Sequence, residues 1–138
     1  MDCSCAASPV LILVDDEATF RLALAELLRS DGHTVLDYAS PATLLAFENI
    51  PKDALLVTDF EMPGQNGVEL ADTFRRARPT SRVMLVSGYS DGAIDPAIAA
   101  RPWLRFMPKP VDYNELHAMI HAEVELSGSP DTGTRLVR

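Results

Sequence analysis

Runs of apolar residues alternate along the chain with segments whose apolar residues recur at helical spacing. Five runs rich in β-forming residues predict strands at about 10–14, 33–38, 54–58, 82–86 and 103–107. The segments between and after them predict helices at about 17–30, 41–48, 68–77, 91–100 and from 112 onward. Strands that alternate with helices through short connections indicate an α/β fold, in which a doubly wound, five-stranded parallel sheet carries five helices on its two faces.

The helical spacing also predicts which side chains face the core. In the first helix the inner face carries Phe20, Leu24, Leu27 and Leu28, and in the last helix it carries Leu116, Met119, Ile120 and Val124. The fourth helix is the weakest of the five, because Pro96 stands in its middle. A proline in a helix interior costs about 3 kcal/mol, so this helix is expected to be short, kinked or mobile.

Polar side chains stand where four of the five predicted strands end. Asp15 and Asp16 follow the first strand, Asp59 the third, Ser87 the fourth and Lys109 the fifth. Taken singly, Asp16 could cap a helix, and Asp59 or Ser87 could begin a turn. Lys109 could simply lie on the surface. The carboxyl ends of parallel strands meet at one edge of a sheet, however, and ligands bind in the crevice outside that edge. Because all of these residues are expected at that edge together, a functional site is favoured over separate structural roles.

The residue types at this edge suit the transfer of a phosphoryl group. Three carboxylates close together repel one another, and a divalent cation relieves that repulsion. Ligands that are all oxygen favour Mg²⁺ over zinc, particularly where water positions stay open for a phosphate. The Lys109 ammonium and the Ser87 hydroxyl could bind phosphoryl oxygens. Asp59, alone in its loop, is the candidate nucleophile that would form an aspartyl phosphate.

Charge and hydropathy narrow the classes of partner. The 138 residues carry a formal net charge of −8, which argues against nucleic acid as a direct partner, because such binding depends on clustered Lys and Arg. No apolar run approaches the ~20 residues of a membrane span, so we expect no membrane partner and a cytoplasmic protein. The two cysteines, Cys3 and Cys5, are too close together and too peripheral to staple a fold.

Four short motifs carry the polar residues at the strand ends. They are Val14-Asp15-Asp16-Glu17, Asp59-x-x-Met62-Pro63-x-x-x-Gly67, Val86-Ser87-Gly88 and Phe106-x-x-Lys109-Pro110. Each is weak alone, but in this order and at this spacing they resemble the response regulator receiver domains of two-component signalling, the family of the chemotaxis regulator. The resemblance covers residues 9–126 and implies a flavodoxin-like sheet with strand order 2-1-3-4-5. Residues 1–8 and 127–138 would then be a disordered lead-in and a flexible tail.

The resemblance assigns a role to each acidic residue of the site. Asp59 would accept a phosphoryl group from a sensor histidine kinase or a histidine phosphotransfer protein. Asp15 and Asp16 would hold Mg²⁺, together with Asp59 and the backbone carbonyl of Glu61.

It also implies the residues of a switch. Ser87 and Lys109 would bind the phosphoryl oxygens, and the peptide bond between Lys109 and Pro110 would be cis. Phe106 would turn inward as Ser87 moves toward the phosphoryl group, so that two packings of the same core compete.

Some positions are individual to this chain. Glu61 and Tyr89, each two residues after a site residue, should flank the phosphoryl group and tune its lifetime. Bulky Tyr89 is expected to hinder the attacking water and so to prolong the phosphorylated state. His117 and His121 are four residues apart on the last helix and could clasp a metal, but no third ligand follows them. An exposed helical face is the simpler interpretation of that pair.

A signalling switch is the function that the motifs indicate, rather than an enzyme: the domain would catalyse only its own phosphorylation and dephosphorylation. Its partners would be the kinase and a downstream protein target or output domain. Exposed Trp103 and Arg105 would allow a homodimer through the face of the fourth helix, fifth strand and fifth helix. The last twelve residues are too few for a DNA-binding unit, so the protein would either act alone or belong to a larger regulator or hybrid kinase.

Two other functions stay open at this point. A Mg²⁺-dependent phosphatase or phosphotransferase on a small substrate would use the same groups, although that class commonly has a second aspartate at the place of Glu61. A phosphorylation-independent interaction module is the other alternative. The complete set of acceptor, metal, hydroxyl and lysine positions argues against it.

Overall fold

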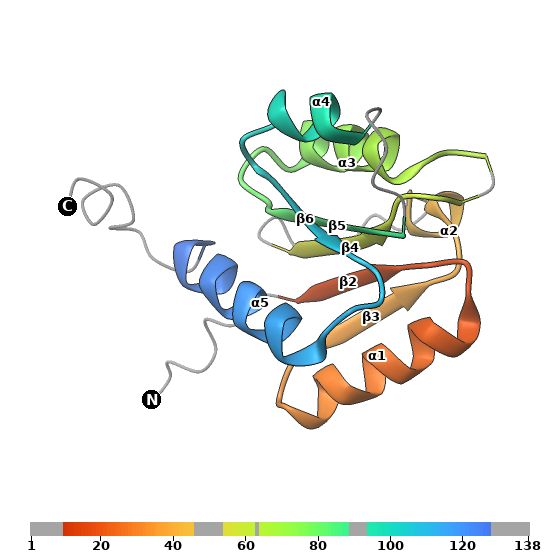
Figure 1. Ribbon diagram of the computed structural model, residues 1–138, viewed down its shortest axis with the longest axis vertical. Coiled ribbons are helices and arrows are strands. Elements are labelled where there is room, and N and C mark those ends of the chain that lie inside the picture. The colour runs from red at the N-terminus through yellow and green to blue at the C-terminus, as the bar shows by residue number, and fades with distance from the viewer. Residues whose placement is uncertain (1–9, 46–53, 63, 89–93, 128–138) are drawn as a thin grey trace.

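The computed structural model describes residues 10–45, 54–62, 64–88 and 94–127, which form one five-stranded sheet flanked by helices (Figure 1). The strands are β2 (Leu11–Val14), β3 (Val35–Tyr38), β4 (Leu55–Asp59), β5 (Val83–Ser87) and β6 (Leu104–Pro108). The helices in these ranges are α1 (Ala18–Ser30), α2 (Pro41–Leu45), α3 (Gly67–Ala77), α4 (Ile94–Ala99) and α5 (Tyr113–Ser127). The strands run in the order β3-β2-β4-β5-β6 and all neighbours are parallel. In chain order this is 2-1-3-4-5, which confirms the predicted fold class.

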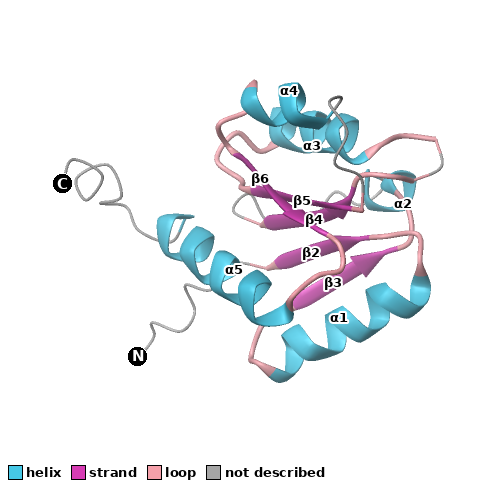
Figure 2. Cartoon of the chain, in the orientation of Figure 1, coloured by secondary structure: helices cyan, strands magenta, loops and turns pink. Residues whose placement is uncertain are grey.

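Helices cover both faces of the sheet. Helices α1 and α5 lie on one face, and α2, α3 and α4 lie on the other (Figures 1 and 2). Each face has its own core, whose largest helical contributors are Leu24, Leu28, Leu116 and Ile120 on the first face and Leu44, Leu70 and Phe74 on the second. Every residue of the three central strands is buried, whereas the edge strands β3 and β6 also contain exposed and half-buried positions. The unbroken apolar runs are therefore the strands that helices cover on both sides.

Helix α1 turns a slightly different face to the sheet than its periodicity predicts. Leu24, Ala25 and Leu28 are buried, whereas the predicted inner residue Leu27 is 47% exposed. The buried stripe is centred on the row of Leu24 and Leu28 and leans toward Ala25, so Leu27 falls on its outer flank. In α5 the predicted inner positions Leu116 and Ile120 are confirmed, because both side chains are fully buried.

The expected penalty for Pro96 does not arise. Helix α4 begins at Ile94 and ends at Ala99, so Pro96 lies in its first turn. A backbone N–H there has no partner within the helix, and its absence costs little. The prediction of an interior proline was wrong, while the prediction of a short helix was right.

The chain ends fall mostly outside the described residues. The predicted lead-in at residues 1–8 lies outside them, and of the predicted tail at 127–138 only Ser127 is described, as the last residue of α5. In the part of the chain that the structure describes, we find no helix with the length and hydropathy needed to cross a membrane.

Candidate functional site

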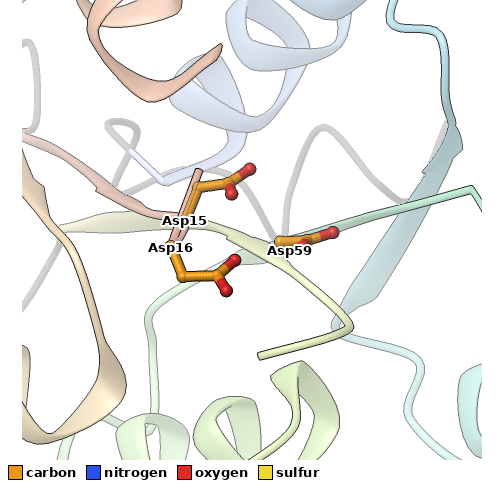
Figure 3. Close-up of side chains that lie close together, drawn as sticks. All are labelled: Asp15, Asp16 and Asp59. Atoms are coloured by element: carbon orange, nitrogen blue, oxygen red, sulfur yellow. The ribbon is translucent and has the colours of Figure 1, made fainter. Parts of the chain in front are cut away.

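Three carboxylates gather at the carboxyl edge of the sheet. Strands β2 and β4 are neighbours, with Val14 opposite Thr58, so the residues that follow, Asp15 and Asp59, stand side by side. Together with Asp16 they offer carboxylate oxygens that lie within 4.8 Å of one another (Figure 3). Asp15 is 1% exposed and Asp59 is 8% exposed, whereas Asp16 is open to solvent. We call these three aspartates and Lys109 the acidic edge.

The turn from β2 into α1 fixes the orientation of Asp15. Its Oδ1 accepts a hydrogen bond from the backbone N–H of Glu17 at 2.9 Å. Its backbone carbonyl accepts a hydrogen bond from the Arg21 guanidinium at 2.7 Å. With its backbone and one carboxylate oxygen engaged in the turn, Asp15 presents its other oxygen, Oδ2, to the acidic edge.

Lys109 brings the one ammonium of the acidic edge. Its Nζ lies 3.3 Å from Asp59 Oδ1 and 3.6 Å from Asp15 Oδ2. The same Nζ stands 4.8 Å from the centroid of the Phe20 ring, whose face attracts a cation. The Lys109 backbone N–H donates to the carbonyl of Ser87 at 2.8 Å, and the Lys109–Pro110 peptide bond is cis. The backbone after β6 therefore holds the lysine over the ends of β2 and β4.

Negative charge exceeds positive charge at the acidic edge. Burial raises the pKa of both the Asp15 and the Asp59 carboxyls, and the proximity of Asp15 raises that of Asp59 further. Burial also acts to lower the pKa of the Lys109 ammonium, but attraction to Asp15 and Asp59 outweighs this and leaves it above its ordinary value. One ammonium faces three carboxylates. A set of oxygen donors that is short of positive charge fits a hard divalent cation such as Mg²⁺.

The predicted switch residues flank this edge on the neighbouring strands. Ser87 is the last residue of β5 and is 1% exposed. Phe106 lies in β6 opposite Leu85 of β5, and its half-buried ring packs against the core on the α3 side of the sheet. The structure thus brings Ser87 to the same end of the sheet as Asp59 and seats Phe106 two residues before the end of β6.

The loop after β4 presses the start of α3 against Asp59. A Cβ built on Gly67 would overlap the carbonyl oxygen of Asp59, and the Gly67 N–H donates to the carbonyl of Phe60 at 2.8 Å. Asn66 and Glu69 cap the helix reciprocally, each accepting a hydrogen bond from the other's backbone N–H at 2.9 Å. Only a glycine at position 67 allows this approach.

A shallow hollow opens beside this loop. It is lined by Phe60, Glu61, Met62 and Asn66. Glu61 is exposed there, close in sequence to the acceptor strand.

Two predicted positions differ from expectation or fall outside the described residues. Trp103 is half-buried rather than exposed, because it packs against the core and the Arg75 guanidinium lies 5.0 Å from its ring centroid. Arg105 on β6 is exposed as expected. Tyr89 lies outside the described residues. Phe20, assigned from its spacing only to the core, also lies under the ammonium of Lys109, a contact for which the sequence carries no signal.

Comparisons with known proteins agree on the kind of domain. The family model described as response regulator receiver domain matches residues 11–121. The DNA-binding transcriptional regulator NtrC of Azospirillum brasilense is 25% identical over 124 residues, which cover 90% of this chain and 26% of that protein. The photosynthetic apparatus regulatory protein RegA of Cereibacter sphaeroides is 31% identical over 124 residues, which cover 88% of this chain and 66% of that protein.

A solved structure carries the same fold. The CheY-like response regulator receiver domain protein of Methanospirillum hungatei JF-1 superposes with a TM-score of 0.79 at 21% identity, covering 87% of this chain and 96% of that one. The chain thus matches nearly the whole of an isolated receiver domain, but only 26% and 66% of the two regulators.

Proposed function

This chain belongs to the response regulator receiver domain family of two-component signalling, and from that premise we propose that Asp59 is its phosphoryl acceptor. The observation that carries the proposal is the acidic edge itself. Asp59 ends a central strand, is nearly buried, and lies 3.3 Å from the Lys109 ammonium with two further aspartates alongside. A nucleophile for phosphoryl transfer needs such neighbours, because negative charge develops on the phosphoryl oxygens as it attacks.

The donor would be a phosphorylated histidine of a sensor kinase or a phosphotransfer protein. A carboxylate oxygen of Asp59 forms a bond to phosphorus while the phosphorus–nitrogen bond breaks and its electron pair returns to the imidazole. Asp15, Asp16, Asp59 and the backbone carbonyl of Glu61 would hold Mg²⁺, which would supply positive charge that the side chains lack. Because Lys109 already touches Asp59, its ammonium would bind a phosphoryl oxygen with little movement.

The consequence of phosphorylation would be a change at the neighbouring strands. Ser87 would move toward the phosphoryl group, and Phe106 would fill the space behind it, which switches the face formed by α4, β6 and α5. That face would contact a downstream target or output domain. A homodimer through it would depend on exposed Arg105 more than on Trp103, which is half-buried. Members of this family are signalling switches rather than conventional enzymes, so catalysis here would be limited to the domain's own phosphorylation and dephosphorylation.

The proposal is tested by intact-protein mass spectrometry after incubation with Mg²⁺ and a small phosphodonor such as acetyl phosphate. Wild type should gain one phosphoryl group, and hydroxylamine should remove it, as expected for an acyl phosphate. Asp59→Asn should gain none. Asp72→Asn is the matched control, because Asp72 lies on α3 in an ion pair with Arg101 and not at the acidic edge. A label that survives in Asp59→Asn would remove the acceptor role from that residue.

The same labelled protein tests the residues proposed to tune the lifetime. We propose that Tyr89, whose placement rests on its spacing from Ser87, shields the phosphoryl group from water, and that exposed Glu61 flanks it. Tyr89→Ala should shorten the half-life of the phosphorylated state severalfold under identical Mg²⁺ conditions. An unchanged decay rate in that variant would contradict the shielding role.

A further inference from the structure

All three histidines of the chain meet at the other end of the sheet. His33 lies in the turn between α1 and β3, just ahead of Val35, which pairs with the first residue of β2 and so marks the amino edge. His117 and His121 lie one turn apart on α5. We call these three residues the histidine cluster. Its members come from two segments that are more than eighty residues apart in sequence, His33 and His117 being separated by 84 positions.

The spacing of His33 and His117 resembles that of two ligands around one ion. His33 Nε2 lies 3.2 Å from His117 Nε2. In a tetrahedral site with Zn–N bonds of about 2.0–2.1 Å, two ligand nitrogens lie about 3.3–3.4 Å apart, and the centroids of their rings lie about 5 Å apart. The ring centroids of His33 and His117 are 5.2 Å apart, and those of His117 and His121 are 4.9 Å apart.

The third imidazole lies farther out, and its ring would have to turn to reach the same point. The ring centroid of His121 is 6.2 Å from that of His33, about 1 Å more than the tetrahedral spacing. His121 is exposed, so its ring can rotate about its side-chain bonds without displacing core residues. Histidines four residues apart on a helix share one face and can chelate one ion together.

A carboxylate and a phenol complete the surroundings. Asp31 Oδ2 lies 3.7 Å from His117 Nε2, a few tenths of an ångström more than about 3.3–3.4 Å, the tetrahedral spacing of two ligands. The Tyr113 hydroxyl donates to that same carboxylate oxygen and lies 3.2 Å from the carbonyl of Leu27. The Tyr113 ring stacks on His117 with 5.7 Å between centroids. Hydrogen bonds and stacking of this kind orient the ligands of metal sites.

The Nε2 atoms of His33 and His117 face each other at 3.2 Å. Two neutral imidazoles whose Nε2 atoms face each other can share only one proton, so one hydrogen bond is the most that this contact satisfies. A metal ion would engage both lone pairs at once.

We propose that His33, His117 and His121, with Asp31 as a fourth ligand, form a site for a divalent transition-metal cation of the zinc class. Imidazole nitrogen favours Zn²⁺ and its neighbours over Mg²⁺, so this site is distinct in chemistry as well as in place from the acidic edge. The bound ion ties the turn at the end of α1 to α5. The proposal does not depend on Asp59 being phosphorylated.

The test is a calorimetric titration with Zn²⁺ in which the other groups that could bind Zn²⁺ are removed by substitution or occupied by another ion. Cys3 and Cys5 are changed to serine, and excess Mg²⁺ is present to fill the acidic edge. The parent should bind one Zn²⁺ per chain. His33→Gln and His117→Gln should each weaken binding by at least about tenfold, since even residues behind the ligands of metal sites are worth that much. His121→Gln should also weaken it, and Glu26→Gln on the exposed side of α1 should not.

Two outcomes would overturn the proposal. Unchanged affinity in His33→Gln would mean that α5 alone chelates the ion through an ordinary pair of helical histidines. Unchanged affinity in the variant lacking all three histidines would place the ion elsewhere. Two independent measurements complete the test. Thermal unfolding without metal should be alike for parent and variants, which shows that the variants are folded. Co²⁺ should give the intense visible bands of four-coordinate cobalt with the parent only.

Discussion

The acidic edge and the histidine cluster lie at opposite edges of one sheet, and they gather side chains in different ways. The acidic edge is built where parallel strands end, so its residues come from the ends of three strands, β2, β4 and β6. The histidine cluster is built where the end of α1 meets α5, so its residues depend on how two helices pack. The first has two buried carboxylates and carries unbalanced negative charge, and the second consists of half-buried and exposed imidazoles.

The two proposed sites would let one small domain separate two kinds of cation by ligand atom alone. Carboxylate oxygens at one edge suit a hard ion that keeps its water, whereas imidazole nitrogens at the other suit a softer ion with tetrahedral geometry. If the two sites are independent, each should respond to its own ion and ignore changes made at the other.

The largest effect should follow from removing charge at the acidic edge. The double variant Asp15→Asn and Asp16→Asn takes away two of three carboxylates and should weaken Mg²⁺ binding about a hundredfold, because affinity for such ions follows the number of charged ligands. Calorimetry or NMR titration measures this. Zn²⁺ affinity should stay at the parent value in the same variant. A parallel loss of Zn²⁺ binding would break the separation of the two sites.

A smaller effect is expected from Gly67→Ala, which tests how the acidic edge is held. The added Cβ would overlap the Asp59 carbonyl and come within 2.7 Å of Leu85 Cδ1. Because one of these is backbone, the overlap cannot be relieved by a rotamer change, and the variant should lose about 1–3 kcal/mol of stability in urea unfolding. Gly88→Ala is the matched control, since among the described residues its Cβ would come no closer to a neighbour than 4.0 Å, at the Lys109 Cβ. Equal stability of the two variants would contradict the close approach.

The smallest effect concerns the neighbour of the histidine cluster. Tyr113→Phe removes the hydrogen bond to Asp31 and should cost about 0.5–1.5 kcal/mol at neutral pH. Burial and the hydrogen bond to Asp31 raise the pKa of Tyr113 to about 12. A phenol whose pKa is raised on folding stabilises the protein below its unfolded value of about 10 and loses that contribution as pH rises toward the folded value.

Two measurements check this. Urea unfolding at neutral pH compares wild type with Tyr113→Phe, and tyrosinate absorbance in an alkaline titration should lose its step at about pH 12 in the variant. Tyr38, whose pKa burial also raises, keeps its own late step and serves as the internal reference. A titration curve unchanged by the substitution would show that Tyr113 does not donate to Asp31.

The acidic edge could be predicted because its signal is local. Each polar residue follows an apolar run, and the parallel sheet alone brings the ends of those runs together. Strand limits were predicted to within a residue or two; Asp59 and Ser87, expected just after their strands, are in fact the last residues of β4 and β5. The pairing of Asp59 with Val86 extends the ladder by that one position.

The histidine cluster could not be predicted because nothing local marks it. The sequence marks His117 and His121 as a pair, but the third member of the cluster, His33, lies far upstream. Which turn packs against which helix depends on tertiary contacts, which periodicity does not encode. The same reason explains Leu27 and Trp103. The exposed fraction of each side chain depends on which of its faces a neighbouring element covers. The guanidinium of Arg75, on α3, lies over the Trp103 indole.

The two contacts of Lys109 have a thermodynamic consequence. The ammonium is shared between Asp15 and Asp59, so the three aspartates and the lysine carry two net negative charges. A phosphoryl group on Asp59 would add roughly one more. Cation and phosphoryl group would then favour each other, and linkage requires that the factor be the same in both directions. The free magnesium concentration around the protein would therefore set how far the modification equilibrium lies toward the phosphorylated form.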